Sequence, residues 1–264
     1  MTVISLTTDF GNQNGFVGTM KGVIWGIAPD AQIADISHEI PPQDIRAAAL
    51  TLRRAVPYFP ASSVHIAVVD PGVGTARRPL GARLGNQFFI LPDNGLITPL
   101  LEATESRGDA IELVHLNRPE YWLPQVYNTF HGRDVFAPCG AHLAAGVPLS
   151  QLGSAISDPL RSPLPRPLVT PTGFEAHILL FDVFGNATTD LPLSALPDPA
   201  RVHLRLPGGE EIHGVLPSYG YALPGELVAV GDSEGYLELA LVDGSAKNRY
   251  ALHRDDLIRV SVAA

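Results

Sequence analysis

One stretch decides how this chain folds: Val64-His65-Ile66-Ala67-Val68-Val69-Asp70-Pro71-Gly72-Val73-Gly74-Thr75-Ala76-Arg77-Arg78. Its first six residues form an apolar run, which predicts a buried strand of a parallel sheet. Proline and two glycines then predict a tight turn. In open α/β sheets, ligands bind beyond the carboxyl ends of the strands. A carboxylate at that place (Asp70), followed by a guanidinium (Arg77), indicates either a catalytic loop or an Asp-capped turn with an incidental surface arginine.

Strand-like and helix-like patterns alternate on both sides of this stretch. Apolar residues recur at helical spacing in some segments and run unbroken or alternate in others. This alternation predicts an α/β domain with a largely parallel sheet, which we place at residues 1–156. The predicted elements are, in chain order, strand 3–8, helix 15–28, strand 32–37, helix 44–54 with Asp44 as N-cap, strand 64–69, hairpin 80–91, strand 111–116 and helix 133–146.

The composition changes at residues 157–173, where five prolines fall among residues with little helical or strand pattern. Such a segment predicts a stiff linker and a domain boundary. Over residues 174–264, short strands alternate with turns such as Pro207-Gly208-Gly209, which predicts a smaller antiparallel β-barrel or sandwich. Its predicted strands are residues 177–181, 201–206, 211–215, 227–230, 236–241 and 257–262.

The bulk composition narrows the class of protein. With 45% hydrophobic and 17% charged residues, the chain is predicted to be globular. A net charge of -9 argues against a nucleic-acid surface. The single cysteine, Cys139, excludes an intramolecular disulfide and a cysteine-based zinc site. The first residues lack a signal-peptide pattern and no apolar run reaches membrane-spanning length, so we expect a cytoplasmic protein with no nucleic-acid or membrane partner.

Two further polar clusters accompany the Asp70–Arg77 loop in the first domain. Thr7-Thr8-Asp9-Phe10-Gly11-Asn12 ends the first strand, and Asp9 there either accepts hydrogen bonds from a vicinal diol such as a ribose or makes an Asx turn. Residues 128–134 precede the last helix, and His131 within them is either a neutral imidazole reaching into a cleft or a satisfied structural histidine. We expect Arg133 and Asp134 to form an ion pair or a helix cap.

A fourth cluster, Phe181-Asp182-Val183-Phe184-Gly185-Asn186, opens the second domain. The pair Gly185-Asn186 is compatible with a simple hairpin turn, with Phe184 in the core. Asp182, however, lies in an otherwise apolar strand and needs a partner, because an unpaired buried carboxylate is costly.

Several familiar catalytic motifs are absent from the sequence. It contains no Gly-x-x-x-x-Gly-Lys-Ser/Thr phosphate loop, and Gly72-Val73-Gly74 lacks the third glycine of a dinucleotide fingerprint. No His-Glu-x-x-His pair and no Gly-x-Ser-x-Gly elbow is present. Metal-dependent hydrolysis and serine-nucleophile chemistry are therefore disfavoured.

Taken together and in this order, the four clusters resemble the S-adenosyl-L-methionine (SAM) hydrolases of the adenosine-forming kind, also called SAM hydroxide adenosyltransferases. The resemblance covers essentially the whole chain, including the closing segments Asp232-Ser233-Glu234-Gly235-Tyr236 and Gly244-Ser245-Ala246. The family is related to the fluorinase and chlorinase that make 5′-halo-5′-deoxyadenosine. The resemblance implies an α/β domain joined to a β-barrel, and SAM as substrate with neither cofactor nor metal. It also implies a homotrimer, with each active site between the N-terminal domain of one subunit and the C-terminal domain of its neighbour.

The same resemblance implies roles for individual residues. Asp70, Arg77 and His131 match the family's water-activating triad, and Asp9 matches the acid that holds the ribose hydroxyls. The other matching positions are Asp182, Phe184 and Asn186 for the adenine and methionine parts, Ser233 and Glu234 for the methionine end, and the main chain near Ala246 for the adenine edge.

The implied reaction is hydrolysis of SAM to adenosine and L-methionine by attack of an activated water at ribose C5′. The related halogenases typically carry a tyrosine where Asp70 stands, and a carboxylate there would repel a halide, which favours water. Gly132 stands where the fluorinase has a serine and the chlorinase a glycine. Two alternatives remain open: a halide-dependent 5′-halo-5′-deoxyadenosine synthase and a non-catalytic module that binds adenosine or SAM.

Overall fold

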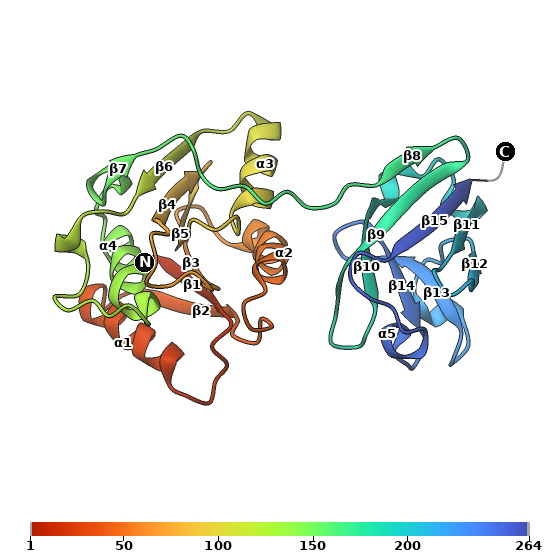
Figure 1. Cartoon of the computed structure of the whole chain (residues 1–264), viewed down its shortest axis with the longest axis horizontal. Coiled ribbons are helices and arrows are strands. Elements are labelled where there is room, and N and C mark those ends of the chain that lie inside the picture. Colours follow the sequence, from red (N-terminus) through yellow and green to blue (C-terminus); the bar gives the residue numbers. More distant parts are fainter. Residues whose placement is uncertain (1, 263–264) are drawn as a thin grey trace. The chain divides into compact units, whose positions relative to one another are not determined.

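The computed structural model describes residues 2–262 and divides into two compact units, Met1–Leu164 and Pro165–Ala264. Each unit buries apolar clusters of its own. The helices and strands of each unit are labelled in Figure 1. No helix within residues 2–262 is long and apolar enough to cross a membrane.

The first unit is built on a seven-stranded sheet with strand order β2-β1-β3-β5-β4-β6-β7. β1 pairs in parallel with β2 and β3, and β3 pairs in parallel with β5. Every residue of β3 is buried, as its apolar run predicted for a central strand. The strands are β1 (Val3–Thr8), β2 (Gln32–Ser37), β3 (Val64–Val68), β4 (Pro79–Leu84), β5 (Gln87–Pro92), β6 (Ile111–His115) and β7 (Ser154–Ala155).

The prediction of a largely parallel sheet is only partly correct, because the sheet is mixed. β4 pairs antiparallel with β5 and β6, and β6 pairs antiparallel with β7. The cause is the hairpin between β4 and β5, whose two-residue turn at Gly85-Asn86 can join only antiparallel strands. Gly85 supplies the positive φ of 59° that this turn uses.

Helices cover both faces of this sheet. α1 (Phe16–Ile27) and α4 (Ala137–Ala144) share one buried apolar cluster with the sheet, whereas α2 (Ile45–Ala55) and α3 (Thr98–Arg107) share another. The predicted N-cap is confirmed, since the Asp44 carboxylate accepts from the Ala47 amide at 2.9 Å. The expected helix over 133–146 differs in its first turn, where residues 132–136 are π-helical before α4 begins.

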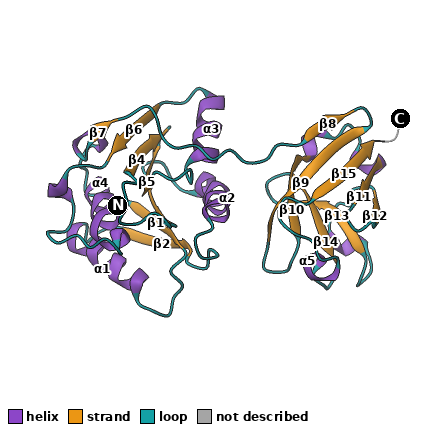
Figure 2. Cartoon of the chain, viewed as in Figure 1, coloured by secondary structure: helices purple, strands orange, loops and turns teal. Residues whose placement is uncertain are grey.

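The second unit is an antiparallel, barrel-like sheet, which confirms the all-β character predicted for it (Figure 2). Its strand order is β12-β11-β15-β9-β10-β14-β13, with β8 paired to β9. Strand β8 lies inside the proline-rich segment predicted as a linker. The strands are β8 (Leu168–Thr170), β9 (Gly173–Phe181), β10 (Ala187–Pro192), β11 (Val202–Arg205), β12 (Glu211–His213), β13 (Leu227–Gly231), β14 (Tyr236–Leu241) and β15 (Leu257–Val262).

Candidate active site

The loop after β3 folds back on itself, which brings Arg77 to Asp70. Successive turns form as the amide of Val73 donates to the carbonyl of Asp70 at 3.2 Å and that of Thr75 donates to Gly72 at 3.2 Å. Gly74 has a φ of +75°, and a Cβ at this position would lie 2.3 Å from the carbonyl oxygen of Asn128. The glycine therefore permits the loop to pack directly against the segment that leads to His131.

Asp70 and Arg77 form a buried, bidentate ion pair. Arg77 Nε donates to Asp70 Oδ1 at 3.1 Å, and Arg77 Nη2 donates to Oδ2. The two side chains are only 4% and 7% exposed, respectively, which excludes the incidental surface arginine considered above. The guanidinium also lies over the ring of Phe136, 5.2 Å from its centre. Two fixed hydrogen bonds hold the carboxylate in one orientation.

The same guanidinium reaches His131 and fixes its tautomer. Arg77 Nη2 lies 3.2 Å from His131 Nδ1. Because arginine can only donate, Nδ1 must accept, and the hydrogen of a neutral ring then resides on Nε2. Burial lowers the pKa of His131, and the positive charge of Arg77 lowers it further, against smaller opposing effects of Asp70 and Asp134. The ring is thus held neutral, with Nε2 as a hydrogen-bond donor.

A buried carboxylate supports the segment that carries His131. Asp134 is fully buried in the π-helical turn and accepts from the amide of Tyr127 at 2.8 Å. Arg133 Nε donates to Asp134 at 2.5 Å, which confirms the expected ion pair. These contacts tie both ends of residues 127–134 together.

Asp9, Asp70 and His131 meet in one cavity of about 270 Å³ at the carboxyl ends of β1 and β3. The Asp9 carboxylate is held in place by the amide of Gln43, which donates to Oδ2 at 2.8 Å. Arg77 lies behind the cavity lining, where it orients Asp70 and His131. The lining residues are Asp9, Phe10, Gln43, Val68, Asp70, Pro71, Val73, Thr129, Phe130, His131 and Gly132.

In the second unit, Asp182 organises the turn between β9 and β10. Its Oδ1 accepts from the amides of Phe184 at 2.9 Å and Asn186 at 2.8 Å, and its Oδ2 accepts from the Asn186 side chain at 3.0 Å. The hydrogen-bond partners that the Asp182 carboxylate requires therefore come from its own turn, from Phe184 and Asn186. Phe184 is 71% exposed in the described chain, so the alternative that placed it in the core is wrong.

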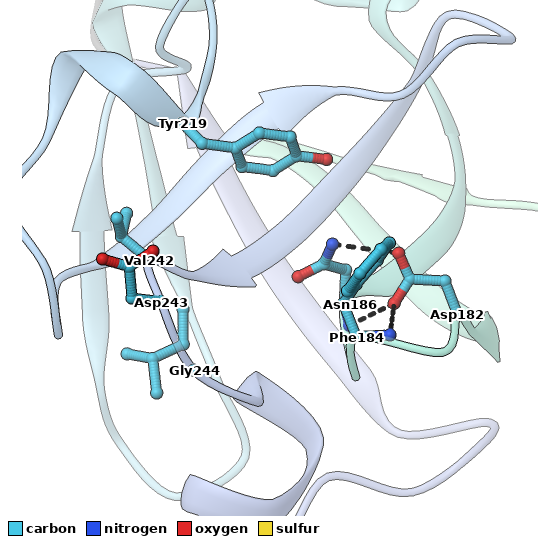
Figure 3. A pocket seen from close by; sticks show the side chains of 8 residues that line it. Asp182, Phe184, Asn186, Tyr219, Val242, Asp243 and Gly244 are labelled. Carbon is cyan, nitrogen blue, oxygen red and sulfur yellow. Dashed lines mark hydrogen bonds between the residues drawn. The ribbon is translucent and has the colours of Figure 1, made fainter.

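This turn borders a second cavity, of about 450 Å³. Figure 3 shows Asp182, Phe184 and Asn186 on one side of it, and Val242, Asp243 and Gly244 on the other. The short helix α5 (Ala246–Arg249) adjoins the same turn, because the amide of Lys247 donates to the carbonyl of Gly185 at 2.9 Å.

Ser233 and Glu234 occupy a different place, the turn that joins β13 to β14. Their turn is held by Asp232, whose carboxylate accepts from the amide of Glu234 at 2.9 Å. Neither residue belongs to the described lining of the 450 Å³ cavity. Of the residues expected in this unit, Asp182, Phe184 and Asn186 line the cavity, whereas Ser233, Glu234 and Ala246 are not among its lining residues.

A pair between the buried Glu238 and the partly exposed Tyr219 was not anticipated from the sequence. Tyr219 lines the cavity and donates to Glu238 at 2.5 Å. Burial raises the pKa of Glu238, and the negative charges of Asp182 and Asp232 act in the same direction. The pKa of Tyr219 is raised as well, chiefly by burial. The sequence did contain a signal for this pair, because Glu238 is a lone carboxylate between Leu237 and Leu239 in an apolar strand.

Titratable side chains that converge on polar cavities are typical of an enzyme acting on a small molecule. Residues 4–153 match the family described as SAM hydroxide adenosyltransferase N-terminal domain, and residues 176–259 match the corresponding C-terminal domain. The chain therefore belongs to the SAM hydroxide adenosyltransferase family, which confirms the resemblance predicted from its motifs.

Similar proteins span nearly the full length of the chain. A protein of Salinispora arenicola named (R)-S-adenosyl-L-methionine hydrolase is 42% identical over 98% of this chain and 97% of its own. One of the same name from Thermus thermophilus is 38% identical over 98% and 100%. A fluorinase of Nocardia brasiliensis is more distant, at 28% over 98% and 97%. A crystal structure of an uncharacterized conserved protein from Thermotoga maritima matches with a TM-score of 0.87, 34% identity, and coverage of 97% and 99%.

Proposed function

We propose that this protein hydrolyses SAM to adenosine and L-methionine by attack of water at ribose C5′. The observation that carries the proposal is the buried Asp70–Arg77 ion pair and its contact with His131, at the cavity that also holds Asp9. Further support comes from the hydrolase names of three relatives at 38–42% identity, compared with 26–28% for three fluorinases.

The chemistry of SAM sets what the site must supply. The sulfonium leaves as a neutral thioether, so no leaving-group acid is needed, and we expect neither a cofactor nor a metal in the reaction. The enzyme must instead hold one water in line with C5′ and accept a proton from it as the C–O bond forms. The electron pair of the breaking C–S bond stays on the methionine sulfur.

The hydrogen-bond pattern gives the three residues different roles in this step. Asp70 is the acceptor for the water proton, since the tautomer of His131 leaves Nε2, the nitrogen that does not contact Arg77, as a donor. His131 Nε2 donates to the water and orients one of its lone pairs. Arg77 fixes both side chains and offsets the negative charge of the nascent hydroxide.

Substrate binding is divided between the two units. Asp9 holds the ribose hydroxyls in the first unit, because a carboxylate can accept from both hydroxyls of a vicinal diol. In the second unit, the exposed ring of Phe184 offers a face for the adenine, beside Asp182 and Asn186. The main chain at Ala246 contacts the adenine edge, and Ser233 and Glu234 bind the methionine end.

We further propose a homotrimer in which the first unit of one subunit and the second unit of its neighbour form each active site. The family resemblance supports this arrangement. The separation of the expected contacts supports it too, since the water-activating group and Asp9 lie in Met1–Leu164 and the other contacts lie in Pro165–Ala264. We also propose that the protein is cytoplasmic.

One experiment separates the reaction from its alternatives. The purified protein is incubated with SAM in ¹⁸O-water containing chloride, and the products are read by mass spectrometry. We expect methionine and adenosine labelled at the 5′ oxygen. A 5′-chloro-5′-deoxyadenosine product would instead identify a halogenase, and unchanged SAM with tightly bound adenosine would identify a non-catalytic binding module.

A further inference from the structure

Two imidazoles and a carboxylate gather on strands β11 and β12, apart from every residue assigned to SAM. They are His203, Glu211 and His213, and their candidate ligand atoms all lie within 4.8 Å of one another. We propose that these three side chains form a surface binding site for a transition-metal cation of the zinc class. The site is separate from the hydrolytic reaction, which uses none of these residues.

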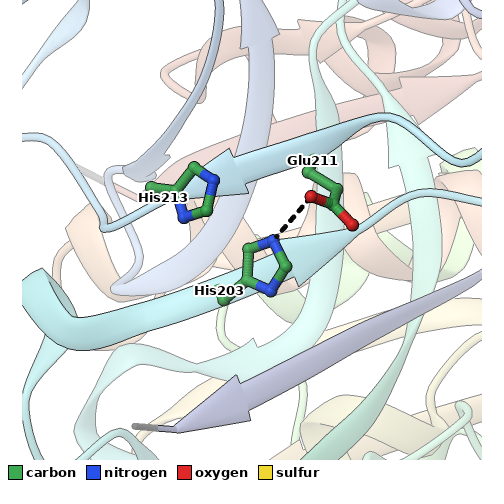
Figure 4. A group of neighbouring side chains, drawn as sticks. All are labelled: His203, Glu211 and His213. Atoms are coloured by element: carbon green, nitrogen blue, oxygen red, sulfur yellow. Dashed lines mark ion pairs between the residues drawn. The ribbon is translucent and has the colours of Figure 1, made fainter.

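The register of the two strands places all three side chains on one face. His203 lies directly opposite His213 in the antiparallel β11–β12 pair, and Glu211 precedes His213 by two residues. Because side chains alternate along a strand, the residues between them point the other way, and Leu204 and Ile212 are buried in the core. Figure 4 shows His203 on one strand, and Glu211 and His213 on the neighbouring strand.

The spacing of the ligand atoms already approaches that of a tetrahedral zinc site. Zinc–nitrogen and zinc–oxygen bonds of about 2.0–2.2 Å set neighbouring ligand atoms of a tetrahedron roughly 3.3 Å apart. His203 Nε2 and Glu211 Oε2 are separated by 3.3 Å. The rings of His203 and His213 are stacked at 4.5 Å, with 11° between their planes, so a tilt of one exposed ring brings the third ligand to the metal.

The surroundings of the His203 ring nitrogen also suit a bound cation. His203 Nε2 is buried yet makes no hydrogen bond of acceptable geometry, despite the nearby Glu211 carboxylate. Two nitrogens and one carboxylate oxygen suit Zn²⁺ and its neighbours rather than Mg²⁺ or Ca²⁺, which prefer all-oxygen sites. Three protein ligands leave a coordination position open to water or another ligand.

The test is calorimetric titration of the metal-stripped, full-length protein with Zn²⁺ alone. We expect saturable binding of one Zn²⁺ per chain and no binding of Mg²⁺. His213→Gln and Glu211→Gln should each weaken Zn²⁺ binding at least tenfold, because even residues beyond the direct ligands are typically worth 10- to 100-fold. The matched control is His253→Gln, since His253 is exposed and lies outside the cluster.

Thermal unfolding provides an independent readout. Zn²⁺ should raise the Tm of the wild type and of His253→Gln, and should leave the Tm of His213→Gln nearly unchanged. Both cluster substitutions are at exposed positions, so the apo proteins should unfold at the same temperature as the wild type. Equal Zn²⁺ affinity in the wild type and both cluster variants would overturn the proposal, as would failure of the wild type to bind Zn²⁺ at all.

Discussion

At the scale of the residue, Arg77 is the centre of the candidate site, because one guanidinium contacts both Asp70 and His131. It holds the carboxylate in a single orientation and selects the tautomer of the imidazole. In the proposed mechanism, these two effects leave Asp70 as the group that accepts a proton. The substitution that tests this role should preserve the shape of Asp70 and remove its basicity.

Asp70→Asn is expected to lower kcat by roughly 10²- to 10⁴-fold, the range typical for loss of a general base. The amide keeps an oxygen that accepts from Arg77, so affinity for adenosine should stay close to that of the wild type. Steady-state kinetics and calorimetric titration with adenosine measure the two quantities. Asp109→Asn, at an exposed ion pair with Arg107, is the control and should leave kcat unchanged. Wild-type turnover by Asp70→Asn would remove Asp70 from the reaction.

The acid limb of the pH profile should report His131. Its pKa is lowered from an ordinary value near 6.5, first by burial and then by Arg77. The neutral ring therefore persists below that pH, and kcat/KM should stay constant through pH 6.5 and fall only on further acidification. Protonation would place a second positive charge against Arg77 and break the Nδ1 hydrogen bond. An acid limb above pH 6.5 that vanishes in His131→Asn would contradict this expectation.

The three residues of the candidate water-activating group could be predicted from the sequence, but their arrangement in space could not. Asp70, Arg77 and His131 stand out as polar residues beside apolar segments, yet 54 positions separate Arg77 from His131, and only the fold brings them to 3.2 Å. The tautomer of His131 follows from that distance and could not be predicted from the sequence. Tyr219 and Glu238 were missed although Glu238 breaks an apolar strand in the same way as Asp182. A buried carboxylate needs a hydrogen-bond or charge partner, and this rule applies to Glu238 as it does to Asp182.

At the scale of the element, the loop between β3 and β4 depends on close contact with the segment before His131. Gly74→Ala should therefore destabilise the protein by more than about 1 kcal/mol, because alanine is strained at positive φ and its Cβ would meet Asn128 at 2.3 Å. The loop must move to relieve this contact, and a displacement of ~1 Å can cost roughly 100-fold in rate. Chemical denaturation and kcat measure the two effects.

The matched control makes the same substitution in a helix. Gly22 lies on the exposed side of α1, and a Cβ there would meet no atom within 4 Å. Gly22→Ala should stabilise the protein by roughly 0.5–1 kcal/mol, because alanine loses less backbone entropy in a helix. An unchanged free energy of unfolding and unchanged kcat in Gly74→Ala would show that the loop does not need its glycine.

The elements that sequence patterns predicted best are those with clear apolar periodicity. β1, α1, β2, α2 and β3 all formed within about a residue or two of their predicted bounds. β10 was missed because Thr188, Thr189 and Asp190 are polar yet buried, with Asp190 accepting from the amide of His177 at 2.8 Å. Hydrogen bonds, rather than apolar alternation, allow this strand to enter the core. The mixed sheet was missed although a hairpin was predicted at residues 80–91. The two strands of a hairpin are antiparallel, so a sheet that contains them cannot be entirely parallel.

At the scale of the whole molecule, the proposed trimer predicts that two inactive chains can complement each other. Asp70→Asn removes the base in the first unit, and Asn186→Ala removes a proposed substrate contact in the second. If each site joins units of different subunits, random assembly of the two variants, homotrimers included, gives wild-type sites at about one quarter of all positions, and trimers that contain both variants have them at about one third. Co-expression should then restore roughly a quarter of the wild-type activity, whereas each variant alone is strongly impaired.

The complementation experiment tests the proposal of shared active sites independently of the proposal of SAM hydrolysis. Light scattering first establishes whether wild type and variants are trimers, and differently tagged chains allow the mixed species to be purified. If both halves of a site belonged to one chain, every site in a mixed trimer would carry one of the two substitutions, and no activity would return. Activity of the wild type together with failed complementation would disprove shared sites while leaving SAM hydrolysis intact, because the two proposals fail in different measurements.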